Sequence, residues 1–158
     1  MQREPAKRSR LMLALSLFYV GGMFLNDAFD RDFDAKHRPE RPIPSGQVSV
    51  QEVFIAGFGL LALGMAGVAL ASRGPEGAPA WTAMASAAAL AAAIVFYNAH
   101  HKGNPLSPLI MGLCRVLVVA TAAFTLTTAL PTPVLLAAIA LLCHLIGLTY
   151  IAKQEHLD

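Results

Sequence analysis

The sequence contains few charged residues for its length. Only 14% of its 158 residues are Asp, Glu, Lys or Arg, whereas soluble domains usually carry about 25%. The charges concentrate in residues 1–10, 27–41 and 153–158, and the long segments between them are nearly uncharged. This distribution argues against a soluble domain with an apolar core and favours a protein that crosses a membrane several times.

Cysteines and long basic tracts are also scarce. The net charge is +2, and no basic tract is long enough to indicate nucleic-acid binding. Cys114 and Cys143 fall inside apolar runs, so we expect both to be buried as small hydrophobic side chains, which indicates nothing about the redox compartment. The basic N-terminus before an apolar run has the look of a signal peptide, but no small-residue cleavage site follows it. A retained membrane span is therefore expected.

The apolar residues gather in five segments. Most of these approach the roughly 20 residues that a helix needs to cross a hydrocarbon layer about 30 Å thick. Alanine and glycine are frequent within them, which lets membrane helices pack closely, and proline and glycine mark the gaps. We predict an all-α fold, a polytopic transmembrane helical bundle of about five spans, with residues 1–158 forming one transmembrane domain. The expected spans are 11–26, 53–72, 79–97, 108–130 and 132–152.

The distribution of Lys and Arg gives a weak indication of orientation. Alternating spans place residues 27–52, 98–107 and 153–158 on one side of the membrane and residues 1–10 and 73–78 on the other. The first side carries six Lys and Arg residues and the second carries five, so the positive-inside rule favours a cytoplasmic first side by a narrow margin. We predict an integral, multi-pass protein of the cytoplasmic (inner) membrane, embedded in the lipid bilayer with this side facing the cytoplasm.

An acidic cluster directly follows the first apolar segment, and we expect the first helix to continue into it. Asp27, Asp30 and Asp34 are spaced i, i+3, i+7, which places them on one face of a continuing helix, whereas Asp32 falls off that face. Three carboxylates on one face repel one another unless a cation neutralises them. Mg²⁺ prefers oxygen ligands and commonly joins one or two carboxylates to substrate phosphates. The cluster therefore suggests a diphosphate bound through Mg²⁺; the alternative is a solvated helix end whose aspartates pair with arginines.

The stretch NDAFDRDFD, followed by RPERPIPSG, resembles the first aspartate-rich signature of the UbiA superfamily of intramembrane prenyltransferases. That signature reads N-D-x-x-D-x-x-x-D and is followed by an arginine-proline-isoleucine stretch. The resemblance implies a partial UbiA-type fold and a Mg²⁺-dependent enzyme that transfers a prenyl group from a prenyl diphosphate to an aromatic or other lipophilic acceptor. It implies that Asp27, Asp30 and Asp34 hold the metal and act in catalysis, and that Asn26 and Arg41 bind the substrate.

Further candidate residues lie on the same side of the membrane. Tyr97 ends the third apolar segment and Lys102 follows it, as a tyrosine and basic residues do in UbiA members; both are expected to bind the diphosphate, although Tyr97 also fits an interfacial aromatic belt. Arg115 lies within the fourth segment, where a cation is costly and is functional by default. We expect it to act in catalysis by pairing with the diphosphate or an aspartate; the alternatives are snorkelling and a structural pair. His100 and His101 are adjacent, so they make a poor metal pair and are interpreted as solvated loop residues.

The resemblance covers most of this chain but about half of the family's architecture. The second aspartate-rich motif is expected near the end of the sequence, where Tyr150 fits a substrate-binding position but Gln154 replaces an aspartate, leaving Glu155 and Asp158 as the acids. Two hypotheses follow. The first is a UbiA-type prenyltransferase, truncated here or completed by another chain. The second is a non-catalytic UbiA-like membrane protein that binds or carries a prenyl-diphosphate lipid. The aspartate face and Arg115 argue against a third, purely structural bundle.

Overall fold

The computed structural model describes residues 3–74, 77, 79–127 and 130–154. These residues form six α-helices, five of which are long and apolar enough to cross a membrane; α2 is the short one. The chain is therefore an all-helical, integral multi-pass membrane protein, as the sequence predicts. The helices are α1 (Arg3–Phe29), α2 (Arg31–His37), α3 (Val50–Ala71), α4 (Trp81–His100), α5 (Ser107–Leu126) and α6 (Thr132–Gln154).

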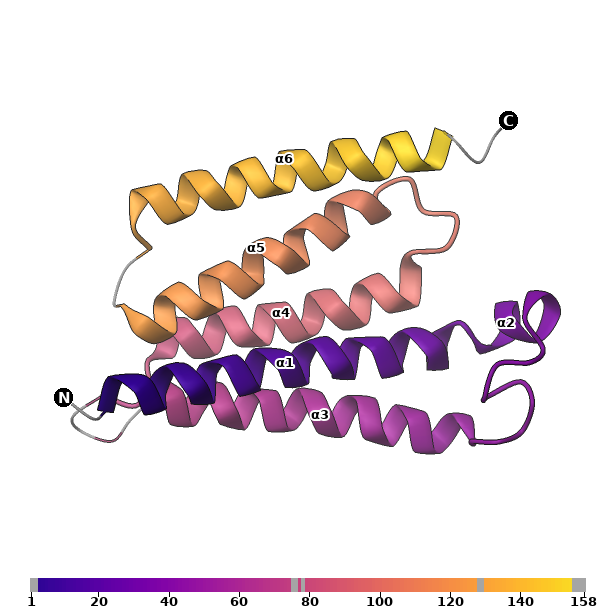
Figure 1. Ribbon diagram of the computed structural model, residues 1–158, viewed down its shortest axis with the longest axis horizontal. Coiled ribbons are helices and arrows are strands. Elements are labelled where there is room, and N and C mark those ends of the chain that lie inside the picture. The colour runs from indigo at the N-terminus through magenta and orange to yellow at the C-terminus, as the bar shows by residue number, and fades with distance from the viewer. Residues whose placement is uncertain (1–2, 75–76, 78, 128–129, 155–158) are drawn as a thin grey trace.

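The five long helices lie side by side and alternate in direction (Figure 1). The most extensive contact joins α1 to α3, followed by those of α5 with α4 and with α6, and α6 lies at one edge of the bundle. At 27 residues, α1 is about 40 Å long, which exceeds the roughly 30 Å hydrocarbon layer. The end of α1 that carries Asp27 lies at the same end of the bundle as α2 and the α4–α5 loop (Figure 1).

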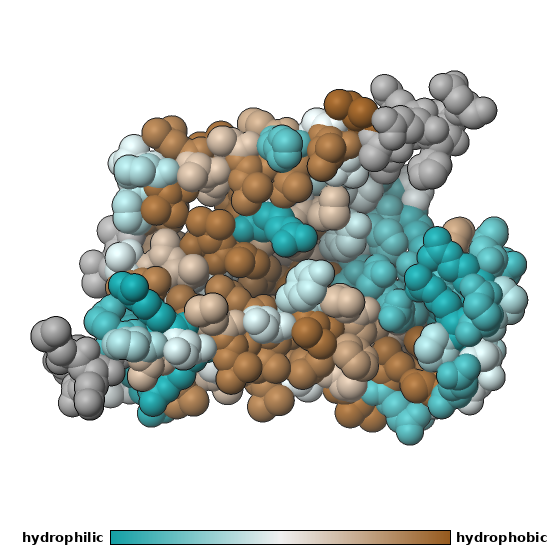
Figure 2. Space-filling view, in the orientation of Figure 1, coloured by the Kyte–Doolittle hydropathy of each residue, from teal (hydrophilic) through white to brown (hydrophobic). Residues whose placement is uncertain are grey.

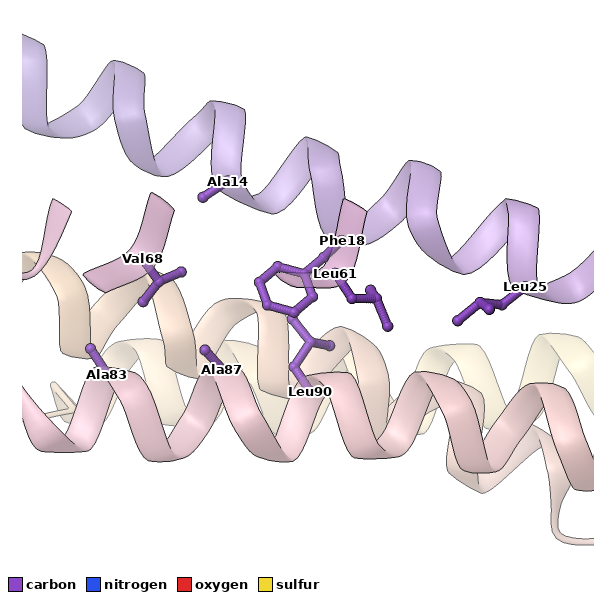
Figure 3. Packing of buried hydrophobic residues seen from close by; sticks show 8 residues of the cluster. All are labelled: Ala14, Phe18, Leu25, Leu61, Val68, Ala83, Ala87 and Leu90. Atoms are coloured by element: carbon purple, nitrogen blue, oxygen red, sulfur yellow. The ribbon is translucent and has the colours of Figure 1, made fainter. Parts of the chain in front are cut away.

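Small residues let α1 and α3 approach closely. A Cβ atom added to Gly57 would lie 2.8 Å from the Leu25 side chain, and one added to Gly64 would lie 2.9 Å from the Phe18 ring. The buried core continues from this interface onto α4, as Figure 3 shows, through Ala14, Phe18, Leu25, Leu61, Val68, Ala83, Ala87 and Leu90. Close backbone approach is typical of membrane helices, which lack a hydrophobic driving force between them. The α1–α3 interface therefore fixes where the end of α1 lies.

Three local expectations change. The first helix does enter the acidic cluster, but it ends at Phe29, and α2 begins only after a turn at Asp30. At this turn Asp30 has ψ near −2°, and its carbonyl accepts hydrogen bonds from the N–H groups of both Phe33 and Asp34, at 3.0 and 2.9 Å. The third and fourth spans are Trp81–His100 and Ser107–Leu126. The expectation that Cys143 is buried is wrong: it is exposed on α6, which packs mainly against α5.

Candidate functional site

A cavity of about 360 Å³ lies between α1, α4 and α5. Its deeper wall is apolar and includes Phe18 and Leu90, which are almost completely buried, whereas Tyr19 and Met23 on its rim are 60% and 54% exposed. Figure 2 shows the corresponding division of the surface, with a hydrophobic band in the middle and hydrophilic residues gathered at the end that carries α2. The polar side chains that line the cavity are Tyr19, Asn26, Asp27, Tyr97, Asn98 and Arg115.

Arg41 joins two of the three predicted aspartates. Its Nη1 atom donates a hydrogen bond to Asp27 Oδ1 at 3.1 Å and another to Asp34 Oδ2 at 2.9 Å. The Asp27 side chain is 57% exposed, but that of Asp34 is only 3% exposed. Among the described residues, the second Asp34 oxygen, Oδ1, is buried without a hydrogen-bond partner. A buried carboxylate oxygen without a partner is costly, so the pair of carboxylates has more capacity for cations than Arg41 fills.

A compact series of turns after α2 brings Arg41 back to the aspartates. The Arg41 N–H donates to the Arg38 carbonyl at 3.1 Å, and the Arg41 carbonyl accepts from the Ser45 N–H at 2.9 Å. Gly46 follows with φ of +76°, a conformation that favours glycine. The segment ends in a capping box, in which Ser49 and Glu52 exchange hydrogen bonds at the start of α3. The glycine and the box thus return the chain to the membrane within a few residues of Arg41.

Asp30 contacts the α4–α5 loop. Its Oδ1 lies 3.0 Å from Lys102 Nζ and 3.5 Å from His101 Nε2, and the side chain is 15% exposed. Lys102 also lies 3.8 Å from the centre of the Phe33 ring, a cation–π distance. The interpretation of His101 as a solvated residue is wrong, because its side chain is 18% exposed and its ring stacks on Tyr97 at 5.1 Å. His100, in contrast, is exposed.

The predicted face of three aspartates is therefore divided. Asp32 points away as expected, with a side chain 86% exposed that pairs with Arg31 at 3.5 Å. Asp27 and Asp34 meet at Arg41, whereas Asp30 meets Lys102. In the part of the chain that the structure describes, no three His, Cys, Asp or Glu side chains lie together as a potential metal site. The turn at Asp30 explains the difference, because the spacing prediction assumed one uninterrupted helix.

Asn98 is a buried polar residue that the sequence analysis did not single out. It lies on α4, is 6% exposed, and lines the cavity next to Asn26. Its Oδ1 accepts a hydrogen bond from Asn26 Nδ2 at 3.1 Å, and its Nδ2 donates to the Gly22 carbonyl at 3.2 Å. An amide directly after Tyr97, at the end of an apolar helix, was the available signal. Asn98 thus links α4 to the end of α1 that carries the aspartates.

Arg115 and Tyr97 present polar groups to the cavity with little competition from the chain. Arg115 is exposed on α5 and lines the cavity. Within the described residues, no hydrogen bond or ion pair joins its side chain to another residue. The Tyr97 hydroxyl lies 3.9 Å from the Met111 sulfur, which is a weak acceptor. Among the residues that line the cavity, Arg115 is the cation, and Tyr97 offers a hydroxyl donor, as does Tyr19 on the rim.

Three predicted substrate-binding residues lie outside the cavity lining: Arg41, which pairs with the aspartates, Lys102 and Tyr150. Lys102 pairs with Asp30, and the Tyr150 hydroxyl donates to the Pro105 carbonyl at 2.9 Å, which fastens α6 to the α4–α5 loop. Glu155 and Asp158, the acids near the expected second motif, lie outside the described residues. The structure thus brings Asn26, Asp27, Tyr97 and Arg115 to one cavity. Asp34 and Arg41 lie outside its lining and are connected to it by the hydrogen bond from Arg41 to Asp27.

A model of the UbiA prenyltransferase family matches residues 4–157 of the chain. The digeranylgeranylglyceryl phosphate synthase of Methanopyrus kandleri is 34% identical over 87 residues, which are 55% of this chain and 29% of that protein. The synthase of the same name from Natronomonas pharaonis is 35% identical over 102 residues, or 65% and 34% of the two chains. That of Methanosarcina mazei is 44% identical over 54 residues, or 34% and 19%. The matches thus span about a third or less of these relatives, and no solved structure matches.

Proposed function

The chain belongs to the UbiA prenyltransferase family, and on that basis we propose that it binds a prenyl diphosphate in the cavity between α1, α4 and α5. The prenyl group is then transferred to a lipophilic acceptor. In this reaction the bond between the prenyl carbon and the diphosphate oxygen breaks, and the diphosphate leaves with the electron pair. The prenyl carbon forms a new bond to the acceptor nucleophile, which loses its proton. The relatives' name adds glyceryl phosphates to the aromatic acceptors that are worth testing.

The observation that carries this proposal is Arg115 in the cavity wall, whose side chain pairs with no other residue that the structure describes. A cation within a membrane span is costly unless an anion or water-filled space compensates it, and the chain supplies no carboxylate partner among the described residues. A diphosphate would supply the anion, with Tyr97 as a hydrogen-bond donor beside it. The apolar wall around Phe18 and Leu90 would hold the prenyl tail and exclude water from the reacting carbon.

The carboxylates also suit a divalent cation. A single cationic atom, Arg41 Nη1, already lies between oxygens of Asp27 and Asp34, and Asp34 Oδ1 is a buried oxygen without a partner in the described chain. All-oxygen donors match the preference of Mg²⁺. We therefore assign Asp27 and Asp34 as the metal-binding pair, with Asp30 as a third ligand that must first leave Lys102. Bound Mg²⁺ would neutralise the charge that develops on the departing diphosphate.

A second candidate function is binding or transport of the prenyl-diphosphate lipid without catalysis. Gln154 in place of the expected second-motif aspartate favours it, because one carboxylate pair could hold a Mg²⁺-diphosphate and still ionise it poorly. Another chain that completes the bundle would restore the first function. In either case we propose that residues 1–158 form one transmembrane domain in the cytoplasmic membrane, with the aspartates facing the cytoplasm.

The test is a paired measurement of binding and transfer. The purified protein in lipid nanodiscs is titrated with labelled geranylgeranyl diphosphate, with and without Mg²⁺, and is then incubated with a panel of aromatic and glyceryl phosphate acceptors. Mg²⁺-dependent binding with a prenylated product supports the enzyme, and binding without product supports the carrier. A protein that binds no more ligand than its Arg115→Leu variant would contradict both.

A further inference from the structure

Asn26 and Asn98 form a hydrogen-bonded chain whose direction is fixed at one end. This series of hydrogen bonds ends at the Gly22 carbonyl oxygen, which lies 3.2 Å from Asn98 Nδ2. A carbonyl oxygen can only accept a hydrogen bond, so Asn98 must turn its NH₂ group toward Gly22. Its own oxygen then faces Asn26, at 3.1 Å from Asn26 Nδ2. Each amide therefore determines the orientation of the next.

The consequence for Asn26 is that its oxygen is kept free. Because its NH₂ group is turned toward Asn98, Asn26 Oδ1 is the amide atom left without a hydrogen-bond partner in the described chain. Asn26 lines the cavity and directly precedes Asp27. An amide oxygen is a neutral hard ligand, whereas an amide NH₂ group would repel a cation. The orientation of Asn26 thus decides whether this position attracts or repels a metal ion.

We propose that Asn98 is a positioning residue, which orients Asn26 so that the amide oxygen of Asn26 serves the cation held by Asp27 and Asp34. This inference rests on the proposed function, because it assumes that a Mg²⁺-diphosphate binds at the cavity. Asn98 is 6% exposed, so water does not readily replace its contacts. Partners that orient metal ligands in this way typically contribute 10- to 100-fold in metal affinity.

The test is a double-mutant cycle on the full chain in nanodiscs. The Mg²⁺ concentration for half-maximal binding of labelled geranylgeranyl diphosphate is measured for the parent, Asn98→Leu, Asn26→Ala and the double variant. When Asn26 is intact, we expect Asn98→Leu to raise this Mg²⁺ concentration about tenfold above that of the parent protein. In the Asn26→Ala background the same change should have less than about a twofold effect, because the amide that Asn98 orients is already gone. Thermal stability without Mg²⁺ is recorded for all four proteins.

Each outcome decides the matter. A purely structural role for Asn98 predicts the same fold-change in both backgrounds and would overturn the inference, as would an unchanged Mg²⁺ requirement in Asn98→Leu. If the leucine variant does not fold, Asn98→Ala replaces it in the same cycle and is judged by the same two criteria. Parent protein that shows no Mg²⁺-dependent binding refutes the proposed function itself, whereas a binding parent with an additive cycle refutes only the role of Asn98.

Discussion

Replacing Arg41 with methionine should destabilise the ligand-free protein by an amount set mainly by Asp34. The side chain of Asp34 is 3% exposed, and its Oδ1 already lacks a partner in the described chain. Losing Arg41 would therefore leave both carboxylate oxygens without a charged donor. Because Arg41 is 36% exposed, we expect a loss of about 2–3 kcal/mol, below the roughly 3–5 kcal/mol for a fully buried pair. The exposed Asp27 should add less than about 1 kcal/mol.

The assay is reversible unfolding in detergent micelles, with two companion variants. Arg38→Met is the matched control, since Arg38 is exposed and its side chain makes no ion pair with the described residues; it should cost no more than about 0.5 kcal/mol. Adding Asp34→Asn to Arg41→Met should recover much of the loss, because the stranded charge is removed. Equal losses for the two arginine variants, or no recovery in the double variant, would refute the assignment of Arg41 to a buried carboxylate.

Magnesium provides a second arm for the same experiment. A divalent cation that binds between Asp27 and Asp34 should stabilise Arg41→Met more than the parent, where it must first displace the guanidinium. At a Mg²⁺ concentration 100 times its dissociation constant, the gain would be about 2.7 kcal/mol. Stabilisation of the parent and the variant by equal amounts would show that Mg²⁺ binds elsewhere.

Three further outcomes are expected. Asp27→Asn should abolish Mg²⁺-dependent prenyl-diphosphate binding in a titration, whereas Asp32→Asn should have little effect, because the Asp32 side chain is 86% exposed and points away; equal losses would point to net charge instead of coordination. Arg115→Leu should leave the thermal stability of the ligand-free protein unchanged or higher, but it should weaken prenyl-diphosphate binding by about 2–5 kcal/mol. A ligand-free variant that is less stable than the parent but binds the ligand with parental affinity would show that Arg115 has a structural role. In a cysteine-free background, an impermeant reagent should label a cysteine at Ser45 from the cytoplasmic side and one at Glu76 only from the opposite side.

The spans were predictable because they depend on local composition. Twenty apolar residues between polar ones leave a chain few alternatives in a bilayer, so the number of spans and the same-end placement of α2 and the α4–α5 loop could be derived (Figure 1). The outward direction of Asp32 followed from helical spacing in the same way. The end of α1 was not predictable in this way, because it depends on the backbone ψ angle of Asp30. The spacing of the aspartates in the sequence does not indicate that angle.

The pairing of side chains was not predictable, because it depends on tertiary contacts. Arg41 was expected to bind substrate, a role that stays a prediction, and the sequence did not indicate that its side chain pairs with both Asp27 and Asp34. Asn26 contacts Asn98, which lies 72 positions later in the sequence, and Asp30 contacts His101 at a similar sequence separation. Each of these contacts exists only because the close α1–α3 interface and the packing of α4 bring the ends of the helices together. A single sequence lists candidate residues, but it does not say which of them neutralise one another.

The aspartate cluster carries its own counterions. Asp27 and Asp34 share Arg41, and Asp30 holds Lys102, so a metal ion that takes over these paired oxygens would displace a side-chain cation. Each cation displaced in this way is released beside the cavity, where it becomes available to an anion. A metal ion and a diphosphate would then bind together, and each would bind more weakly without the other.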